Sequence, residues 1–65
     1  MKNNIRTVRK SQKLTQDKLA EICDLDINTI RNTERGRSIP SIITIVKISE
    51  ALGVSIDDLY SKMSL

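Results

Sequence analysis

A row of amide and guanidinium side chains is the part of this sequence best suited to specific hydrogen bonding. Its members recur every three or four residues and would share one face of a helix: Asn28, Arg31, Asn32 and Arg35. An Asn amide can form two hydrogen bonds with adenine, and an Arg guanidinium can form two with guanine. Asn is a poor helix former, so two on one face argue against the alternative, an ordinary solvated surface. The row therefore indicates a surface that could read base edges.

The helix that carries this row has recognisable ends. Asp26 is a favourable N-cap and Gly36 a favourable C-terminal stop, so we predict a helix over residues 27–35. Ile30 would face the interior of the fold. Ile27 would lie on the outer side, where an aliphatic side chain can contact a thymine methyl group.

A second helix, predicted over residues 16–23, precedes the first and would position it. Thr15 is a good N-cap for this helix. Two helices that cross steeply over a short turn need a small residue where their backbones approach, and Ala20 is at that place. Asp24 falls where the turn requires a left-handed backbone, which costs a non-glycine residue about 1 kcal/mol. We therefore predict a helix-turn-helix unit over residues 16–35.

Hydrophobic spacing elsewhere is also helical, with no alternation long enough to suggest a strand. It predicts a first helix over about residues 4–12 and a fourth helix that follows Ser41 and stops at Gly53. A capping box beginning at Ser55 opens a short fifth helix. We expect a single all-α domain of five helices over residues 1–65. The inward stripe of the fourth helix would be Ile42, Ile45, Ile48, Ser49 and Leu52.

Composition excludes several classes of function. The chain has 65 residues, no histidine and one cysteine, so neither an intrachain disulfide nor a clustered zinc site is expected. Cys23 is expected to be an inert core thiol. No apolar run approaches the roughly 20 residues that span a bilayer. No nucleophile with a partner and no phosphate-binding glycine loop is recognisable. We expect a cytoplasmic protein that is not an enzyme and needs no cofactor or metal.

Charge is distributed unevenly along the chain, whose net charge is +3. Residues 1–13 carry five basic residues and no acidic one, and residues 14–26 are mainly acidic. Residues 27–37 are basic again, with three arginines and one glutamate. Basic residues gathered on one surface favour a polyanionic partner such as nucleic acid. A solvated basic face would give the same pattern, so charge alone does not decide the partner.

Several motifs stand at separated places along the chain. They are Leu14-Thr15-Gln16-Asp17-Lys18-Leu19-Ala20-Glu21, then Ile30, Glu34-Arg35-Gly36-Arg37, Pro40-Ser41 and Ala51-Leu52-Gly53-Val54-Ser55. Together they make the chain resemble the Cro and repressor type of helix-turn-helix regulators over about residues 5–60. The resemblance implies a five-helix DNA-binding domain that usually acts as a dimer on a two-fold-related operator in double-stranded DNA.

The resemblance also implies roles for individual residues. It pairs Arg9 of the first helix with Glu34 of the third as a partly buried structural ion pair that is costly to break from one side. The residues implied to face bases in the major groove are Ile27, Asn28, Arg31 and Asn32. The residues implied to contact the DNA backbone are Gln16, Thr29, Arg35, Arg37 and Ser38.

Three positions depart from the family pattern. Asp24 replaces the usual turn glycine, which suggests backbone strain. Ile27 stands where a polar or basic residue is commoner, so base reading would depend partly on a methyl contact. Thr44 replaces the acidic residue that often completes the cap begun by Ser41. None of these departures threatens the fold, but the second leaves the operator sequence open.

Several aliphatic side chains exceed what one small core can absorb. We expect them to form a homodimer contact, although incidental exposure is the alternative. The expected function is a sequence-specific transcriptional regulator, a dimeric repressor or autoregulator that reads a palindromic operator through the third helix. The alternative is a protein-interaction module, such as an antitoxin or antirepressor, with a foreign protein as partner. The expected dimer residues are Ile43, Val46, Tyr60, Met63 and Leu65.

Overall fold

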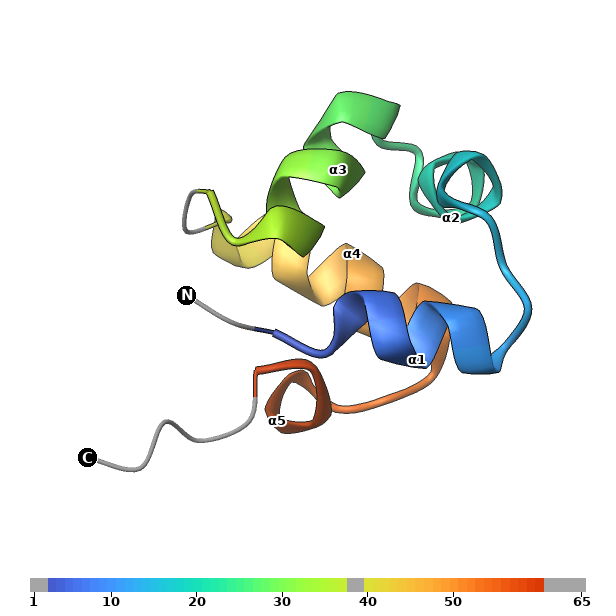
Figure 1. Cartoon of the computed structure of the whole chain (residues 1–65). Helices are drawn as coiled ribbons and strands as arrows, with labels where there is room; N and C mark the ends of the chain where they lie inside the picture. Colours follow the sequence, from blue (N-terminus) through green and yellow to red (C-terminus); the bar gives the residue numbers. More distant parts are fainter. Residues whose placement is uncertain (1–2, 38–39, 61–65) are drawn as a thin grey trace.

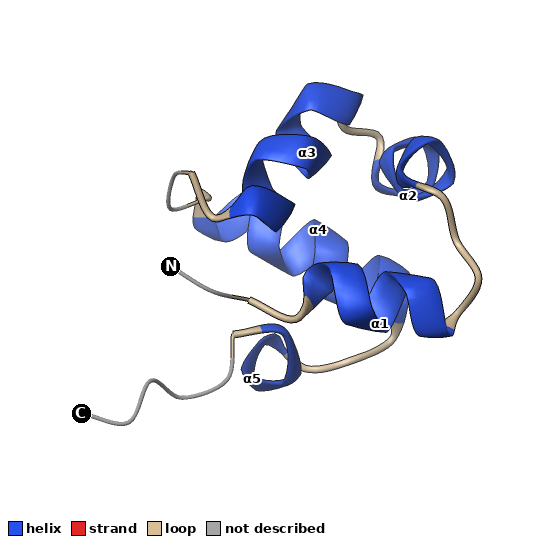
Figure 2. Cartoon of the chain, viewed as in Figure 1, coloured by secondary structure: helices blue, strands red, loops and turns tan. Residues whose placement is uncertain are grey.

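Four of the five described helices begin at a residue whose side chain and extended conformation suit an N-cap. The computed structural model describes residues 3–37 and 40–60 and contains no strand among them (Figure 2). The predicted all-α fold of five helices is therefore confirmed. The helices are α1 (Ile5–Ser11), α2 (Gln16–Cys23), α3 (Ile27–Arg35), α4 (Ile42–Leu52) and α5 (Ile56–Leu59).

Four helices start with a side-chain cap whose oxygen accepts a hydrogen bond from an amide in the first turn. The donor–acceptor distances lie between 2.7 and 3.2 Å. Ser55 forms the predicted capping box, because its own amide also donates to the Asp58 carboxylate at 3.2 Å. Thr44 supports the Ser41 cap of α4 through a hydroxyl–hydroxyl hydrogen bond of 3.0 Å with Ser41. The capping residues are Thr15, Asp26, Ser41 and Ser55.

The first four helices end in the same way. A left-handed residue follows the last turn, and the next amide donates to the carbonyl five residues earlier at 2.9 to 3.2 Å, as in a Schellman motif. Gly36 and Gly53 adopt the left-handed conformation freely. Lys13 (φ 60°) and Asp24 (φ 56°) adopt it against a steric cost. The sequence predicted this conformation at Asp24 but not at Lys13.

One aliphatic side chain from each helix meets at the centre of the fold. Figure 1 shows α4 passing behind α1, with α2 and α3 above this pair and α5 below it. Because every helix contributes to one core, α3 is held against the other four. The five side chains are at most 1% exposed: Ile5, Leu19, Ile30, Ile48 and Leu59.

The predicted inward stripe of α4 is wrong at its first residue. Ile42 is 66% exposed, whereas the rest of the stripe is buried or half-buried. Helical periodicity gives the side on which a residue lies, but not whether another element covers the first turn. Ile42 therefore adds a second exposed aliphatic side chain beside Ile43, which is also 66% exposed.

Candidate nucleic-acid interface

The outer face of α3 carries the predicted row of polar side chains, and all four members are exposed. Ile30 and Thr33 on the opposite face are buried. Arg31 Nη1 donates to Asn28 Oδ1 at 3.4 Å, so these two side chains lie together on the surface. The Asp26 carboxylate caps the start of the helix by accepting from the Asn28 amide at 2.7 Å. The arrangement is a set of hydrogen-bonding groups on a rigid support.

Ile27 differs from the other residues expected to face bases. It is half-buried and packs against the hydrophobic core, whereas it was expected on the outer side as an exposed residue. Only the exposed remainder of its side chain could meet a thymine methyl group. Thr29 is half-buried, while Arg35 and Arg37 are exposed. Ser38 lies outside the described residues.

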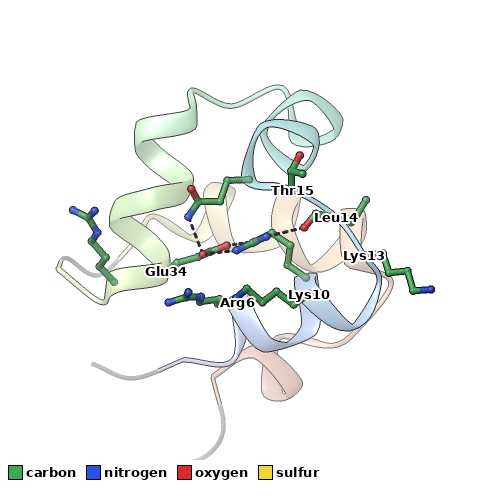
Figure 3. Close-up of a pocket in the computed structure, with 9 residues that line it drawn as sticks. Arg6, Lys10, Lys13, Leu14, Thr15 and Glu34 are labelled. Carbon is green, nitrogen blue, oxygen red and sulfur yellow. Dashed lines mark hydrogen bonds and ion pairs between the residues drawn. The ribbon is translucent and has the colours of Figure 1, made fainter.

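Glu34, near the end of α3, joins three parts of the fold. Arg9 Nε lies 2.6 Å from Glu34 Oε2 and Arg9 Nη2 lies 3.2 Å from Oε1, with the two side chains only 8% and 3% exposed. Arg9 Nη1 also donates to the Leu14 carbonyl at 2.7 Å (Figure 3). Gln16 Nε2 donates to Glu34 Oε1 at 3.0 Å. Gln16, which was expected to hold a phosphate, thus uses one amide hydrogen within the chain and keeps the other.

A cleft of about 640 Å³ opens beside this network, and we call it the α1 cleft. It is lined by Arg6, Lys10 and Lys13 at the α1 end and by Arg35 at the end of α3. No individual role was predicted for Arg6, Lys10 and Lys13. Their signal was the run of basic residues without an acid in residues 1–13. What the sequence could not show is that α1 and its following loop lie beside the end of α3.

The residues expected to form a dimer contact lie in two kinds of environment. Ile43 is largely exposed, and Val46 and Tyr60 are half-buried. The Tyr60 hydroxyl is buried without a hydrogen-bond partner in the described part of the chain, and burial raises the pKa of this phenol. Met63 and Leu65 lie outside the described residues.

Cys23 has the environment of an unreactive core thiol. It is 5% exposed, and its Sγ donates to the Lys47 carbonyl at 3.7 Å. Burial raises the pKa of the thiol, and the nearby Lys47 charge offsets only part of this effect. A raised pKa keeps the sulfur protonated at neutral pH and makes it a poor nucleophile.

Residues 3–37 and 40–60 contain no group of three potential metal-ligating side chains. None of their helices is both long enough and apolar enough to cross a bilayer.

Comparison with known proteins agrees with this geometry. A sequence profile described as helix-turn-helix matches residues 5–59. The chain is 34% identical over 61 residues to the immunity repressor protein of Bacillus phage phi105, covering 94% of this chain but only 42% of that repressor. It is 45% identical over 56 residues to the control protein C.BamHI of Bacillus amyloliquefaciens, covering 85% of this chain and 69% of that protein.

A solved structure shares the fold as well. The restriction-modification controller protein C.AhdI from Aeromonas hydrophila aligns with a TM-score of 0.80 at 29% identity, covering 85% of this chain and 83% of that chain. Profile, relatives and fold agree with the polar row on α3 and the helix-turn-helix formed by α2 and α3. The chain therefore belongs to the helix-turn-helix family of Cro- and repressor-type transcriptional regulators, which are DNA-binding proteins and not enzymes.

Proposed function

We propose that this chain binds a specific two-fold-symmetric site in double-stranded DNA as a homodimer and acts there as a repressor or autoregulator. The exposed polar row of α3, fixed from behind by Ile30, is the observation that carries the proposal. α3 would lie in the major groove, where amides and guanidinium groups can distinguish base pairs. The base-contacting residues would be Asn28, Arg31 and Asn32, with a partial methyl contact from Ile27.

Contacts with the DNA backbone would orient α3 in the groove. Such contacts supply affinity and register but carry no direct sequence information. The amides at the start of α2 and the second amide hydrogen of Gln16 suit a phosphate oxygen. The proposed backbone contacts are Gln16, Thr29, Arg35, Arg37 and Ser38.

The proposed dimer contact is formed by α4 and α5. Ile43 on α4 is an exposed aliphatic residue, and the half-buried Tyr60 directly follows α5. Two copies related by a two-fold axis would present their α3 helices about 34 Å apart, one turn of DNA. The complete proposed set is Ile43, Val46, Tyr60, Met63 and Leu65.

The biological role suggested by the relatives is local control of a small genetic unit in the cytoplasm. One relative is an immunity repressor of a phage, and two others are control proteins, one of them of a restriction-modification system. By analogy, the chain would act as a phage-type repressor, as the controller of a restriction-modification operon, or as a small regulator of a mobile element.

The proposal is tested by selecting bound sites from random duplex DNA and then measuring binding of variants to the selected site. Asn28→Ala and Asn32→Ala should each weaken binding by about 1–3 kcal/mol and relax the preference at one base position. Thr7→Ala is a suitable control, since Thr7 is exposed on α1 and does not line the α1 cleft. Its affinity should match that of the unmodified chain.

The same variants separate this function from a protein-interaction module such as an antitoxin or antirepressor. In that second case the Asn28→Ala and Asn32→Ala changes would leave the main activity unaltered. Selection that returns no preferred sequence, or Asn variants with undiminished discrimination, would contradict the proposed function.

A further inference from the structure

The α1 cleft concentrates positive charge outside the helix-turn-helix unit. Arg6 and Lys10 are four residues apart and lie on one side of α1. Lys13 follows the helix in a left-handed conformation and lines the same cleft. Figure 3 draws Arg6 and Lys10 below the Glu34 carboxylate, with Lys13 at the far end of the cleft. Like charges four residues apart on a helix repel each other, so Arg6 and Lys10 do not stabilise one another.

None of these cations is neutralised within the described part of the chain. The ion pairs found there join Arg9 to Glu34 and Lys18 to Glu21. The side chains of Arg6, Lys10, Lys13 and Arg35 form no hydrogen bond or ion pair with any residue of 3–37 or 40–60. Unpaired positive charges around a concave surface produce a local field that attracts an anion.

The single acidic group in the cleft does not cancel this field. Glu34 is almost completely buried, and its carboxylate already accepts hydrogen bonds from Arg9 and Gln16. The main-chain amides of Gln16 and Asp17, at the start of α2, donate to no acceptor among the described residues. They add donors at the positive end of the helix.

We propose that the α1 cleft binds phosphates of the DNA backbone through Lys10 and Arg6, so that α1 extends the DNA contact beyond the helix-turn-helix. This inference rests on the proposed function. Arg35 belongs both to the outer face of α3 and to the cleft, so a DNA strand that passes α3 continues toward α1. The ligand is the sugar–phosphate backbone, and the contact is independent of sequence.

The test measures the salt dependence of binding to duplex DNA of random sequence, which requires no knowledge of the operator. Lys10→Gln should reduce the slope of log K against log salt by about 0.9, the value for one lost phosphate contact. If the lost phosphate contact contributes nothing to affinity at 1 M salt, this change in slope corresponds to about an eightfold loss of affinity at 0.1 M salt. Arg6→Gln should act in the same direction.

Lys47→Gln is the matched control. Lys47 is also a lysine without an ion pair among the described residues, and it lies on α4 outside the cleft. The control removes the same charge and should leave the slope unchanged. On a selected site, Lys10→Gln should weaken specific and random binding equally, whereas Asn32→Ala should lower the ratio between them. Thermal unfolding by circular dichroism verifies that each variant is folded.

Equal slopes for Lys10→Gln, Arg6→Gln and Lys47→Gln would overturn this inference and leave the proposed function intact. Loss of DNA binding by the unmodified chain at low salt would instead overturn the proposed function. Inorganic phosphate added at constant ionic strength should not displace DNA.

Discussion

The Arg9–Glu34 pair combines short hydrogen bonds with near-complete burial. Two charges removed from water cost several kcal/mol each, which a pair recovers only when its geometry is good and its remaining polar atoms are satisfied. Arg9 also donates to Leu14, and Glu34 also accepts from Gln16, so both side chains have additional partners. The pair links α1, the start of α2 and the end of α3, and its main consequence is to fix the position of α3.

Removing one partner should therefore be far more damaging than replacing both. We expect Glu34→Ala to destabilise the fold by about 3–5 kcal/mol, because Arg9 would remain buried and unpaired. The total stability expected for 65 residues is only about 3–10 kcal/mol, so this variant should be largely unfolded. The apolar double variant Arg9→Met/Glu34→Leu should recover most of the loss. Urea unfolding followed by circular dichroism measures both, and a double variant less stable than the single one would contradict this account.

Individual residues were predictable from sequence to different degrees. The exposed row on α3 followed from spacing alone, because one helical face is set by the 3.6-residue period. The pairing of Arg9 with Glu34, which are 25 residues apart, came only through the family resemblance. The left-handed conformation of Lys13 was missed because no glycine or asparagine marks that position. The partial burial of Ile27 was missed because a helical-wheel projection does not show how far the core extends around the first turn of α3.

The C-terminal ends of the first four helices adopt the same Schellman-type conformation with different residue types at the left-handed position. The first four helices close with the same hydrogen bonds, yet only two of the left-handed positions are glycine. Three of the residues that follow those positions, Leu14, Leu25 and Val54, are partly buried against the core. This hydrophobic contact accompanies the motif and explains why it tolerates Lys13 and Asp24.

Exchanging residue types at these ends should shift stability in opposite directions. Asp24→Gly should stabilise the protein by about 0.5–1 kcal/mol because the left-handed strain is relieved. Gly53→Ala should destabilise it by about 1–2 kcal/mol. A Cβ at Gly53 would meet no atom within 4 Å, so the second cost is purely conformational. Urea midpoints at one protein concentration measure both changes. A loss of stability in Asp24→Gly would mean that the Asp side chain itself stabilises the turn.

Helix boundaries were the most predictable part of the fold. The bounds of α2 and α3 agree with the prediction because side-chain caps and left-handed stops are local signals. The prediction that Ile42 faces inward was wrong for a non-local reason, since its exposure depends on which neighbouring elements reach the first turn of α4. The α1 cleft was missed for the same kind of reason. Its cations become one surface only when α1 lies beside the start of α2 and the end of α3.

The molecule as a whole separates its surfaces by chemistry. Exposed amides and guanidinium groups lie on α3, unpaired cations line the α1 cleft, and the most exposed large aliphatic side chains lie at the start of α4. Small domains bury only about 60% of their unfolded surface, so covering the aliphatic residues by self-association would add stability. The proposed dimer therefore links operator symmetry to the stability of a marginal fold.

Introducing a charge at the start of α4 should separate dimerisation from DNA contact. In a two-fold interface each residue occurs twice, so Ile43→Glu would bring two carboxylates into the contact. We expect the dimer dissociation constant to rise by about tenfold or more, since each tenfold corresponds to 1.4 kcal/mol. Helix content should not change, because Ile43 is 66% exposed. Sedimentation equilibrium measures the dissociation constant, and titration against whole and half operators measures DNA binding.

Ile22→Glu is the matched control for this change, since Ile22 is 49% exposed on α2 and lies outside the proposed contact. It should leave the dimer constant unaltered. Ile43→Glu should bind a half operator as tightly as the unmodified chain but lose the additional affinity for the whole palindrome, because the second copy no longer arrives already attached. If Ile22→Glu dissociates the dimer and Ile43→Glu does not, the proposed contact through α4 and α5 is wrong. The dimer interface would then lie on α2, and the distance between the two α3 helices would be set by that interface.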